Sequence, residues 1–307
     1  MNKLTKYGLT ALAGSLVATS VSAGELGVSG SWSWSYDAGD SDEVTGNPFS
    51  MGDSVTFSGS GETDQGWTAG VSYELDGGTF DDYKLTLDMG DGGNLTYGGA
   101  SVAGDGINSV SNIVPAADTV VYSMTDSATA YGVADGSAST GNIGYNITVG
   151  DVKVSADMTK GAGTDRSIGL TYTGVEGMTL VYGQGEKNPG NVNGGTDETV
   201  MGIKYAVAGA TLAYMQTEVD LGGTGAADED STHMGVSFAI NDDLTVSYAT
   251  QEVDITGKGE DETNSGFGIS YTMGSMSVAA YAGKTENGNG VSTADDEGKG
   301  ITLSIAF

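Results

Sequence analysis

The stretch that decides the fold is ITLSIAF, residues 301–307, which ends the sequence. Large apolar residues alternate there with small ones, so that one side of an extended chain carries Ile301, Leu303, Ile305 and Phe307. A period of two is the geometry of a β-strand, because successive side chains point to opposite faces. Terminal residues fray unless something holds them. The stretch therefore predicts a strand with one apolar face, held by a neighbouring strand.

The same alternation recurs along the rest of the chain. It is clear in LGVSGSWSWSY (residues 26–36), WTAGVSYEL (67–75) and YKLTLDM (83–89), where one side is aromatic or aliphatic and the other small or polar. About sixteen such segments of about ten residues can be traced, whereas strands of soluble sheets usually have about five or six. A tilted strand of about ten residues matches the thickness of a bilayer. The pattern predicts an all-β fold: a closed antiparallel transmembrane barrel of about 16 strands.

The connections between these segments support the same fold. Short connectors are ETDQG, GDGGN, GVEG, Gly150-Asp151, Ala208-Gly209, Asn241 to Asp243 and Gly274-Ser275, and longer ones such as EKNPGNVNGGTDE lie between them. Short periplasmic turns that alternate with longer external loops are typical of a bacterial outer-membrane barrel. We expect this alternation to hold without exception, with both ends of the barrel chain on the side of the short turns.

The first 23 residues differ from the rest. Lys3 and Lys6 precede an apolar run of residues 9–17, and Val21-Ser22-Ala23 places small residues at both recognition positions of a cleavage site. This pattern predicts a signal peptide over residues 1–23 and a mature barrel over 24–307. The weaker alternative is a membrane-anchoring helix, for which the run is too short. The chain has 52 glycines, 3 prolines and no cysteine, so it needs no disulfide chemistry after export.

Together, the signal-like start, the strand count, the turn alternation, a long segment near residues 100–139 and the terminal Phe307 resemble the Gram-negative general porins of alphaproteobacterial type. The resemblance covers essentially the whole mature chain. It implies a homotrimer in the outer membrane, in contact with lipid and lipopolysaccharide, that lets small hydrophilic solutes and ions diffuse passively. It also implies insertion by the barrel assembly machinery, which would read a C-terminal signal formed by Tyr281, Ile301, Leu303, Ile305 and Phe307.

The segment of about residues 100–139 is the candidate constriction. It is far longer than the other loops, and it carries apolar residues that can pack against a wall, namely Ile107, Val110, Ile113 and Val114. In the porins that the chain resembles, the third loop folds into the lumen and narrows it, which implies an acidic side made by Asp105, Asp118 and Asp126. The alternatives are that these aspartates are solvated, and that TVVYSM (119–124) is a further strand.

Positive charge is scarce enough to place residue by residue. Strand parity puts Lys84, Lys153 and Lys204 opposite the lipid-facing residues, and Arg166 lies at a strand start. The resemblance implies that these four residues form a basic pore wall facing the acidic loop. The set is sparse and mostly lysine, so a strong arginine ladder is not expected. A wall ion pair or a rim charge is the alternative role for each lysine.

The formal net charge of −30 is the clearest electrostatic feature. Acidic clusters at residues 228–230, 260–262 and 295–297 fall in long loops, where they would attract cations and give a weak cation preference. Their carboxylates could also bind Ca²⁺ at the external loops and bridge to lipopolysaccharide, although no EF-hand spacing occurs. Solvated acidic loops are the alternative. We expect no other cofactor, and no nucleic-acid partner, because basic tracts are missing.

The sequence gives no support for an enzyme, because His233 is the single histidine and no nucleophile–base pair can be named. Two rival functions remain. A substrate-selective porin would need an aromatic track inside the lumen, whereas most aromatic residues here share the lipid-facing parity. A secreted structural or adhesive β protein would show a fixed repeat and shorter strands.

Overall fold

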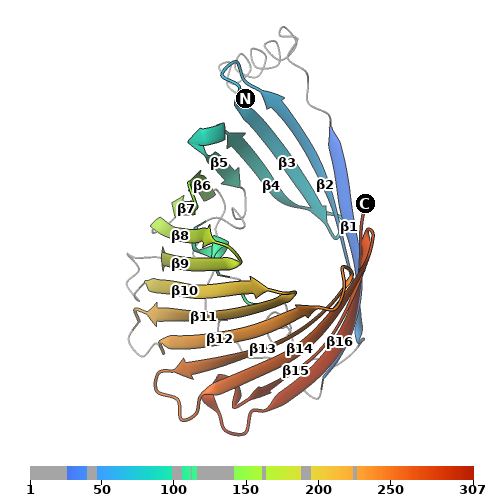
Figure 1. Ribbon diagram of the computed structural model, residues 1–307, viewed down its shortest axis with the longest axis vertical. Helices are drawn as coiled ribbons and strands as arrows, with labels where there is room; N and C mark the ends of the chain where they lie inside the picture. Colours follow the sequence, from blue (N-terminus) through green and yellow to red (C-terminus); the bar gives the residue numbers. More distant parts are fainter. Residues whose placement is uncertain are drawn as a thin grey trace.

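A computed structural model describes residues 26–39, 47–98, 106–111, 113–115, 142–160, 164–187, 195–223 and 227–307. Within these ranges sixteen strands form one closed antiparallel barrel, in which each strand pairs with its neighbours in sequence and β16 pairs with β1 (Figure 1). This confirms the predicted fold class. The predicted signal peptide, residues 1–23, lies outside the described residues.

The strands have 8 to 14 residues, apart from one of five, and a tilted bilayer crossing takes about 9–11. They are β1 (Gly27–Gly39), β2 (Phe49–Glu62), β3 (Thr68–Asp76), β4 (Thr79–Asp88), β5 (Asn94–Gly98), β6 (Asn142–Val149), β7 (Val152–Lys160), β8 (Thr164–Val175), β9 (Met178–Lys187), β10 (Thr196–Val207), β11 (Ala210–Leu221), β12 (Glu229–Ala239), β13 (Leu244–Ile255), β14 (Glu262–Met273), β15 (Met276–Glu286) and β16 (Asp296–Ala306). The described helical elements are the short 3₁₀ turns η2 (Gly90–Gly92), η3 (Gly106–Ser109) and η4 (Gly288–Gly290). Among the residues described, no helix has the length and apolar character to cross a membrane.

The last strand is held as its alternation predicts. Trp32 and Trp34 of β1 lie opposite Ile305 and Leu303 of β16. Beyond the end of β16, the Phe307 N–H donates to the Gly30 carbonyl at 3.0 Å, and the Gly30 N–H donates to the Phe307 carbonyl at 2.8 Å. The backbone ladder therefore closes the barrel up to the final residue.

All seven predicted short connectors are turns between consecutive strands, and we call their side of the barrel the turn end. The opposite loop end departs from the expected alternation. There β3 and β4 are joined by Gly77 and Gly78 alone, and β7 and β8 by residues 161–163. Gly77 and Gly78 have φ values of 54° and 76°, and positive φ at both central positions is what a tight two-residue hairpin requires. The expectation of strict long–short alternation was therefore wrong at these two connections.

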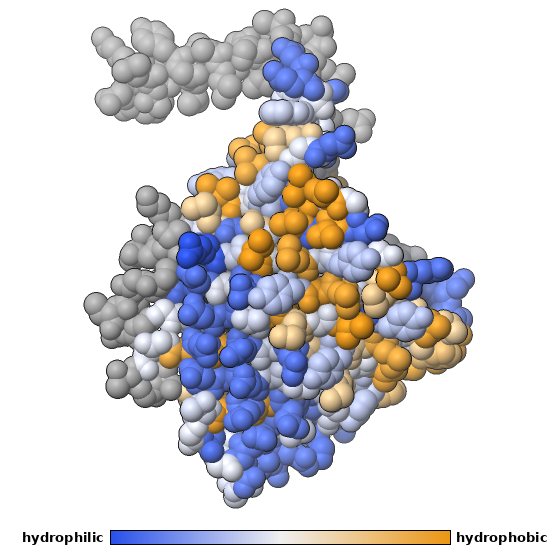
Figure 2. All heavy atoms as spheres, turned by 60° about the vertical axis from the view of Figure 1, so that its left-hand side comes forward, coloured by the Kyte–Doolittle hydropathy of each residue, from blue (hydrophilic) through white to orange (hydrophobic). Residues whose placement is uncertain are grey.

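The two faces of the wall differ in chemistry. One face carries exposed apolar residues on nearly every strand, for example Val71, Leu85, Leu212, Val236 and Ile269. Figure 2 shows hydrophobic residues gathered in a broad zone of the outer surface, bordered by hydrophilic ones. The other face is mostly serine, threonine, glycine and alanine. The apolar face is therefore the outward one, because only that face can meet lipid in a closed barrel.

The main buried apolar cluster lies on the inward face. It joins Ile107, Val110, Ile113 and Val114 to wall residues that include Val200 and Met215. The residues described between 106 and 115 thus pack against the inner wall rather than against solvent. This confirms the expectation that the apolar residues of the long segment pack against something.

Candidate functional site: the barrel interior

The three predicted wall lysines lie on the inward face of three strands. Lys84 on β4 is opposite Ser72 and Gly98, while its neighbour Leu85 is exposed on the outward face. Lys153 on β7 and Lys204 on β10 have the same orientation by their strand registers. The structure adds Lys187 on β9. It is an odd number of residues from the outward Tyr182 and therefore lies on the inward face. The parity of Leu180 and Tyr182 could have identified Lys187 from the sequence.

Arg166 does not belong to the pore wall. It shares its face with the exposed Ile168 and Tyr172, so its side chain is on the outward side of β8. Its guanidinium donates to both carboxylate oxygens of Glu186 on β9, through Nε at 3.1 Å and Nη2 at 2.8 and 3.0 Å. The predicted wall role of Arg166 is therefore corrected. Because Arg166 lies at the start of a strand, the sequence pattern did not show which face it occupies. A shift of one residue along a strand exchanges the two faces.

Acidic residues outnumber the lysines on the described inner wall. The strand registers place these carboxylates inward: Asp37, Glu62, Glu74, Asp76, Asp88, Asp157, Asp165, Glu198, Glu229, Glu262 and Asp296. The described inner wall therefore carries more acidic than basic side chains.

Two serine hydroxyls hold the beginning of the long segment to the wall. The Gly106 N–H donates to Ser155 Oγ on β7, and the Ile107 N–H donates to Ser167 Oγ on β8, both at 2.8 Å. The Ser167 hydroxyl in turn donates to the Asp157 carboxylate. Because these groups are buried, each pairing fixes the position of η3 on β7 and β8.

Glycines on the wall make room for the same segment. A Cβ built on Gly183 would lie 2.7 Å from Val110 Cγ2, one on Gly202 would lie 2.6 Å from Ile113 Cδ1, and one on Gly235 would lie 2.6 Å from Val114 Cγ1. A Cβ built on Gly169 would come closer still to the Gly106 carbonyl oxygen. The sequence reasoning missed these glycines, although glycine inside a strand often marks a close approach. They form a seat for residues 106–115 that runs from β8 to β12.

The predicted acidic side of the constriction cannot be placed on this seat. Asp105, Asp118 and Asp126 lie outside the described residues, as does TVVYSM. Their opposition to the wall lysines therefore stays a prediction.

At the loop end, the connection between β15 and β16 also reaches the inner wall. The Asn289 N–H donates to Glu262 Oε2, and Asn264 Nδ2 donates to Glu262 Oε1, both at 2.8 Å. Thr285 Oγ1 donates to Asn264 Oδ1 at 2.5 Å, and Asn264 Nδ2 also approaches Gln251 at 3.3 Å. This hydrogen-bonded network ties η4 to β13, β14 and β15.

Tyr281 lies inside the barrel at the closing seam. Its ring covers Gly300 of β16, and its hydroxyl donates to Asp37 of β1. It is the one aromatic residue on the inward face of the described strands. Ile301, Leu303 and Ile305 lie on the opposite, outward face of the wall. The assembly signal assigned to these residues and Tyr281 stays a prediction.

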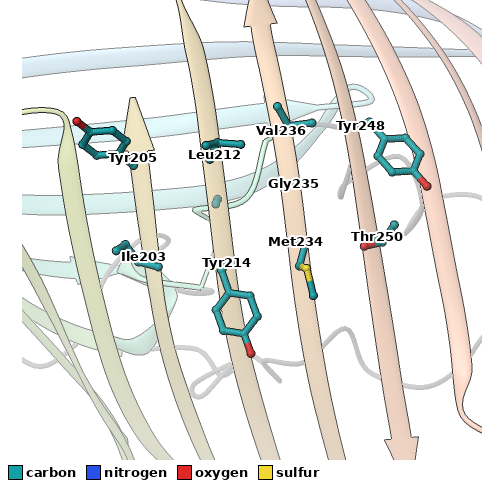
Figure 3. Close-up of a pocket in the computed structure, with 10 residues that line it drawn as sticks. Ile203, Tyr205, Leu212, Tyr214, Met234, Gly235, Val236, Tyr248 and Thr250 are labelled. Carbon is teal, nitrogen blue, oxygen red and sulfur yellow. The ribbon is translucent and has the colours of Figure 1, made fainter. Parts of the chain in front are cut away.

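The remaining aromatic residues of the strands face outward. Tyr205, Tyr214 and Tyr248 line a shallow depression on the outer surface of β10 to β13, together with Leu212 and Met234 (Figure 3). This depression is on the lipid-facing wall and is not the lumen.

The interior consequently has no aromatic track in its described part. It also has no group of three converging His, Asp or Glu side chains there, and His233 is a buried wall residue.

Comparisons with known proteins agree with this architecture. The family model described as Gram-negative porin matches residues 8–297. A loop-deletion form of OmpT, an outer membrane protein of Vibrio cholerae, has 13% identity and a TM-score of 0.67, with 93% of this chain and 100% of that chain covered. A triple mutant of Rhodopseudomonas blastica porin has 15% identity and a TM-score of 0.67, with 92% and 100% covered. No curated protein matches the sequence. At these identities the solved structures establish the shared fold.

Proposed function

The chain belongs to the Gram-negative porin family, whose members are channels of the outer membrane, and we propose that it is a general porin with a weak preference for cations. Small hydrophilic solutes and ions would diffuse through it down their gradients. Selection would come from size at the seat of residues 106–115 and from the charge of the wall.

The observation that carries this proposal is the contrast between the two faces of one closed wall. The outward face is apolar on nearly every strand, whereas the inward face is small and polar and bears carboxylates and lysines. A water-filled interior is the environment that such a face needs, since charged groups against hydrocarbon would be costly. The lack of an aromatic track on the described inner wall favours general diffusion over selection of one substrate class.

The charge balance of the wall supports the cation preference. Lysines on β4, β7, β9 and β10 are fewer than the inward carboxylates of the described strands. The sequence as a whole has 41 acidic residues against 11 lysines and arginines. Anions would therefore enter against an unfavourable potential.

The direct test is a recording from the purified mature chain in a planar bilayer under a salt gradient. We expect the current to rise in steps grouped in threes, as a homotrimer would give. The reversal potential should have the sign that a cation-selective pore produces under this gradient. A folded, heat-modifiable preparation without conductance would refute the channel. A reversal potential of the opposite sign would refute the cation preference but not the channel.

A further inference from the structure

Three oxygen-bearing side chains lie together on the inner wall of β11 and β12. Thr217 is directly opposite Ser231 in the register of the two strands, and Glu229 is two residues from Ser231 on the same face. Their residues are only 4%, 3% and 9% exposed, respectively. The three side chains thus share one buried patch of the wall, on the loop-end side of the glycine seat.

The polar atoms of this patch are unsatisfied. Within the part of the chain that the structure describes, Thr217 Oγ1, Ser231 Oγ and Glu229 Oε2 have no hydrogen-bond partner. Leaving a buried hydroxyl unpaired is unfavourable, and leaving a buried carboxylate without compensation is far more so. A native wall would not keep three such atoms side by side unless something else satisfied them.

The neighbouring strands offer no lysine or arginine to this patch. β11, β12 and β13 contain no lysine or arginine, and neither do residues 99–141. The neighbours of Glu229 across the sheet are the apolar Val219 and Ile255. No lysine or arginine of these strands can therefore compensate Glu229, which leaves a cation from solution as the candidate.

A second carboxylate sets the charge that is needed. Glu262, only 1% exposed, interacts unfavourably with Glu229 through its charge. Glu262 already accepts hydrogen bonds from Asn264 and from the Asn289 N–H. Two acidic side chains near the loop end, on β12 and on β14 with β13 between them, favour a divalent ion over a monovalent one.

We propose that Thr217, Glu229 and Ser231 bind a divalent cation on the inner wall of β11 and β12. Carboxylate and hydroxyl oxygens are hard donors, and Ca²⁺ accepts them in irregular geometry, whereas Mg²⁺ demands a near-ideal octahedron. Because no three acidic or histidine side chains converge among the described residues, water must complete the coordination. The ion would be Ca²⁺ or one of similar size, and its site differs from the acidic external loops.

The experiment compares two neighbouring carboxylates on opposite faces of β12. Glu229→Gln removes the proposed ligand, whereas Asp230→Asn removes an exposed outward charge that lies opposite Glu218 and Asp254. Folded protein is stripped with chelator, and Ca²⁺ binding is measured by equilibrium dialysis with ⁴⁵Ca²⁺. Thermal unfolding midpoints are recorded with and without Ca²⁺, since an ion bound only by the folded state raises the midpoint.

We expect Glu229→Gln to bind one Ca²⁺ fewer per chain than the wild type and to lose most of the Ca²⁺-dependent rise in midpoint. Asp230→Asn should keep both. Equal losses in the two variants, or no loss in either, would overturn the proposal. If Glu229→Gln does not fold, the double variant Thr217→Val, Ser231→Ala keeps the net charge and should weaken Ca²⁺ binding about tenfold; unchanged binding there would also overturn it.

Discussion

Ser167 helps to hold η3 on the inner wall. It accepts the Ile107 N–H on the inner wall of β8. In Ser167→Ala that buried N–H has no acceptor, which costs about 1–3 kcal/mol. We expect the segment of residues 99–141 to be cut faster by protease added to the folded protein and the single-channel current to become noisier.

The matched control is Ser237→Ala, which removes another inward hydroxyl, on β12 opposite Thr211. It should leave both readouts at the wild-type level. Equal protease sensitivity in the two variants would contradict the role given to Ser167.

Lys204 tests the electrostatics of the wall. Lys204→Gln removes an inward positive charge, so the electrostatic potential inside the barrel becomes more negative. The reversal potential should therefore shift in the direction of greater cation selectivity. Arg166→Gln is the control, because Arg166 faces outward and pairs with Glu186. A shift of the same size in both variants would show that net charge, rather than position on the wall, sets the selectivity.

At the scale of elements, the seam between β15, β16 and β1 depends on a glycine. A side chain on Gly300 would collide with the ring of Tyr281, and overpacking of this kind costs roughly 1–3 kcal/mol. We expect Gly300→Val to unfold at a lower temperature than the wild type in a heat-modifiability assay. Gly61→Val is the control, since a Cβ there meets no atom within 4 Å. An unchanged midpoint for Gly300→Val would contradict this account of the seam.

The elements were largely predictable from the sequence because a membrane strand has to alternate. The outward residues must be apolar at every second position, so the strands and the seven short turns could be recognised directly. The hairpin at Gly77 and Gly78 was also readable as Asp-Gly-Gly, but the assumption of long external loops concealed it. The wall role predicted for Arg166 was wrong because a residue at the end of a strand has few neighbours that show which face it occupies.

What could not be predicted depends on contacts between distant segments. Nothing local in Gly183, Gly202 or Gly235 indicates that residues 106–115 will pack on them, because that requires the barrel to close and the segment to turn inward. The wall site of Thr217, Glu229 and Ser231 likewise depends on the register of β11 against β12. Serine, threonine and glycine are common throughout this sequence, so their type alone did not separate these positions from the others.

For the whole molecule, the net charge of −30 predicts that the proposed cation preference depends on salt. The Debye length is about 10 Å at 0.1 M and about 3 Å at 1 M salt. We expect the cation preference, measured from reversal potentials at a fixed concentration ratio, to be larger at low ionic strength and to diminish near 1 M. A preference that stays constant across this range would place selection in close contacts at the constriction rather than in the field of the wall.

The pairing of β1 with β16 makes both strands necessary for a closed wall. A polypeptide that stopped before β16 would leave β1 and β15 as unpaired edges, each exposing a row of N–H and C=O groups that hydrocarbon cannot satisfy. Such a fragment could form most of the local hairpins but not a stable membrane structure. Closure thus makes the stability of the sheet in the membrane an all-or-none property, because the pairing of β16 with β1 removes the last unpaired edges.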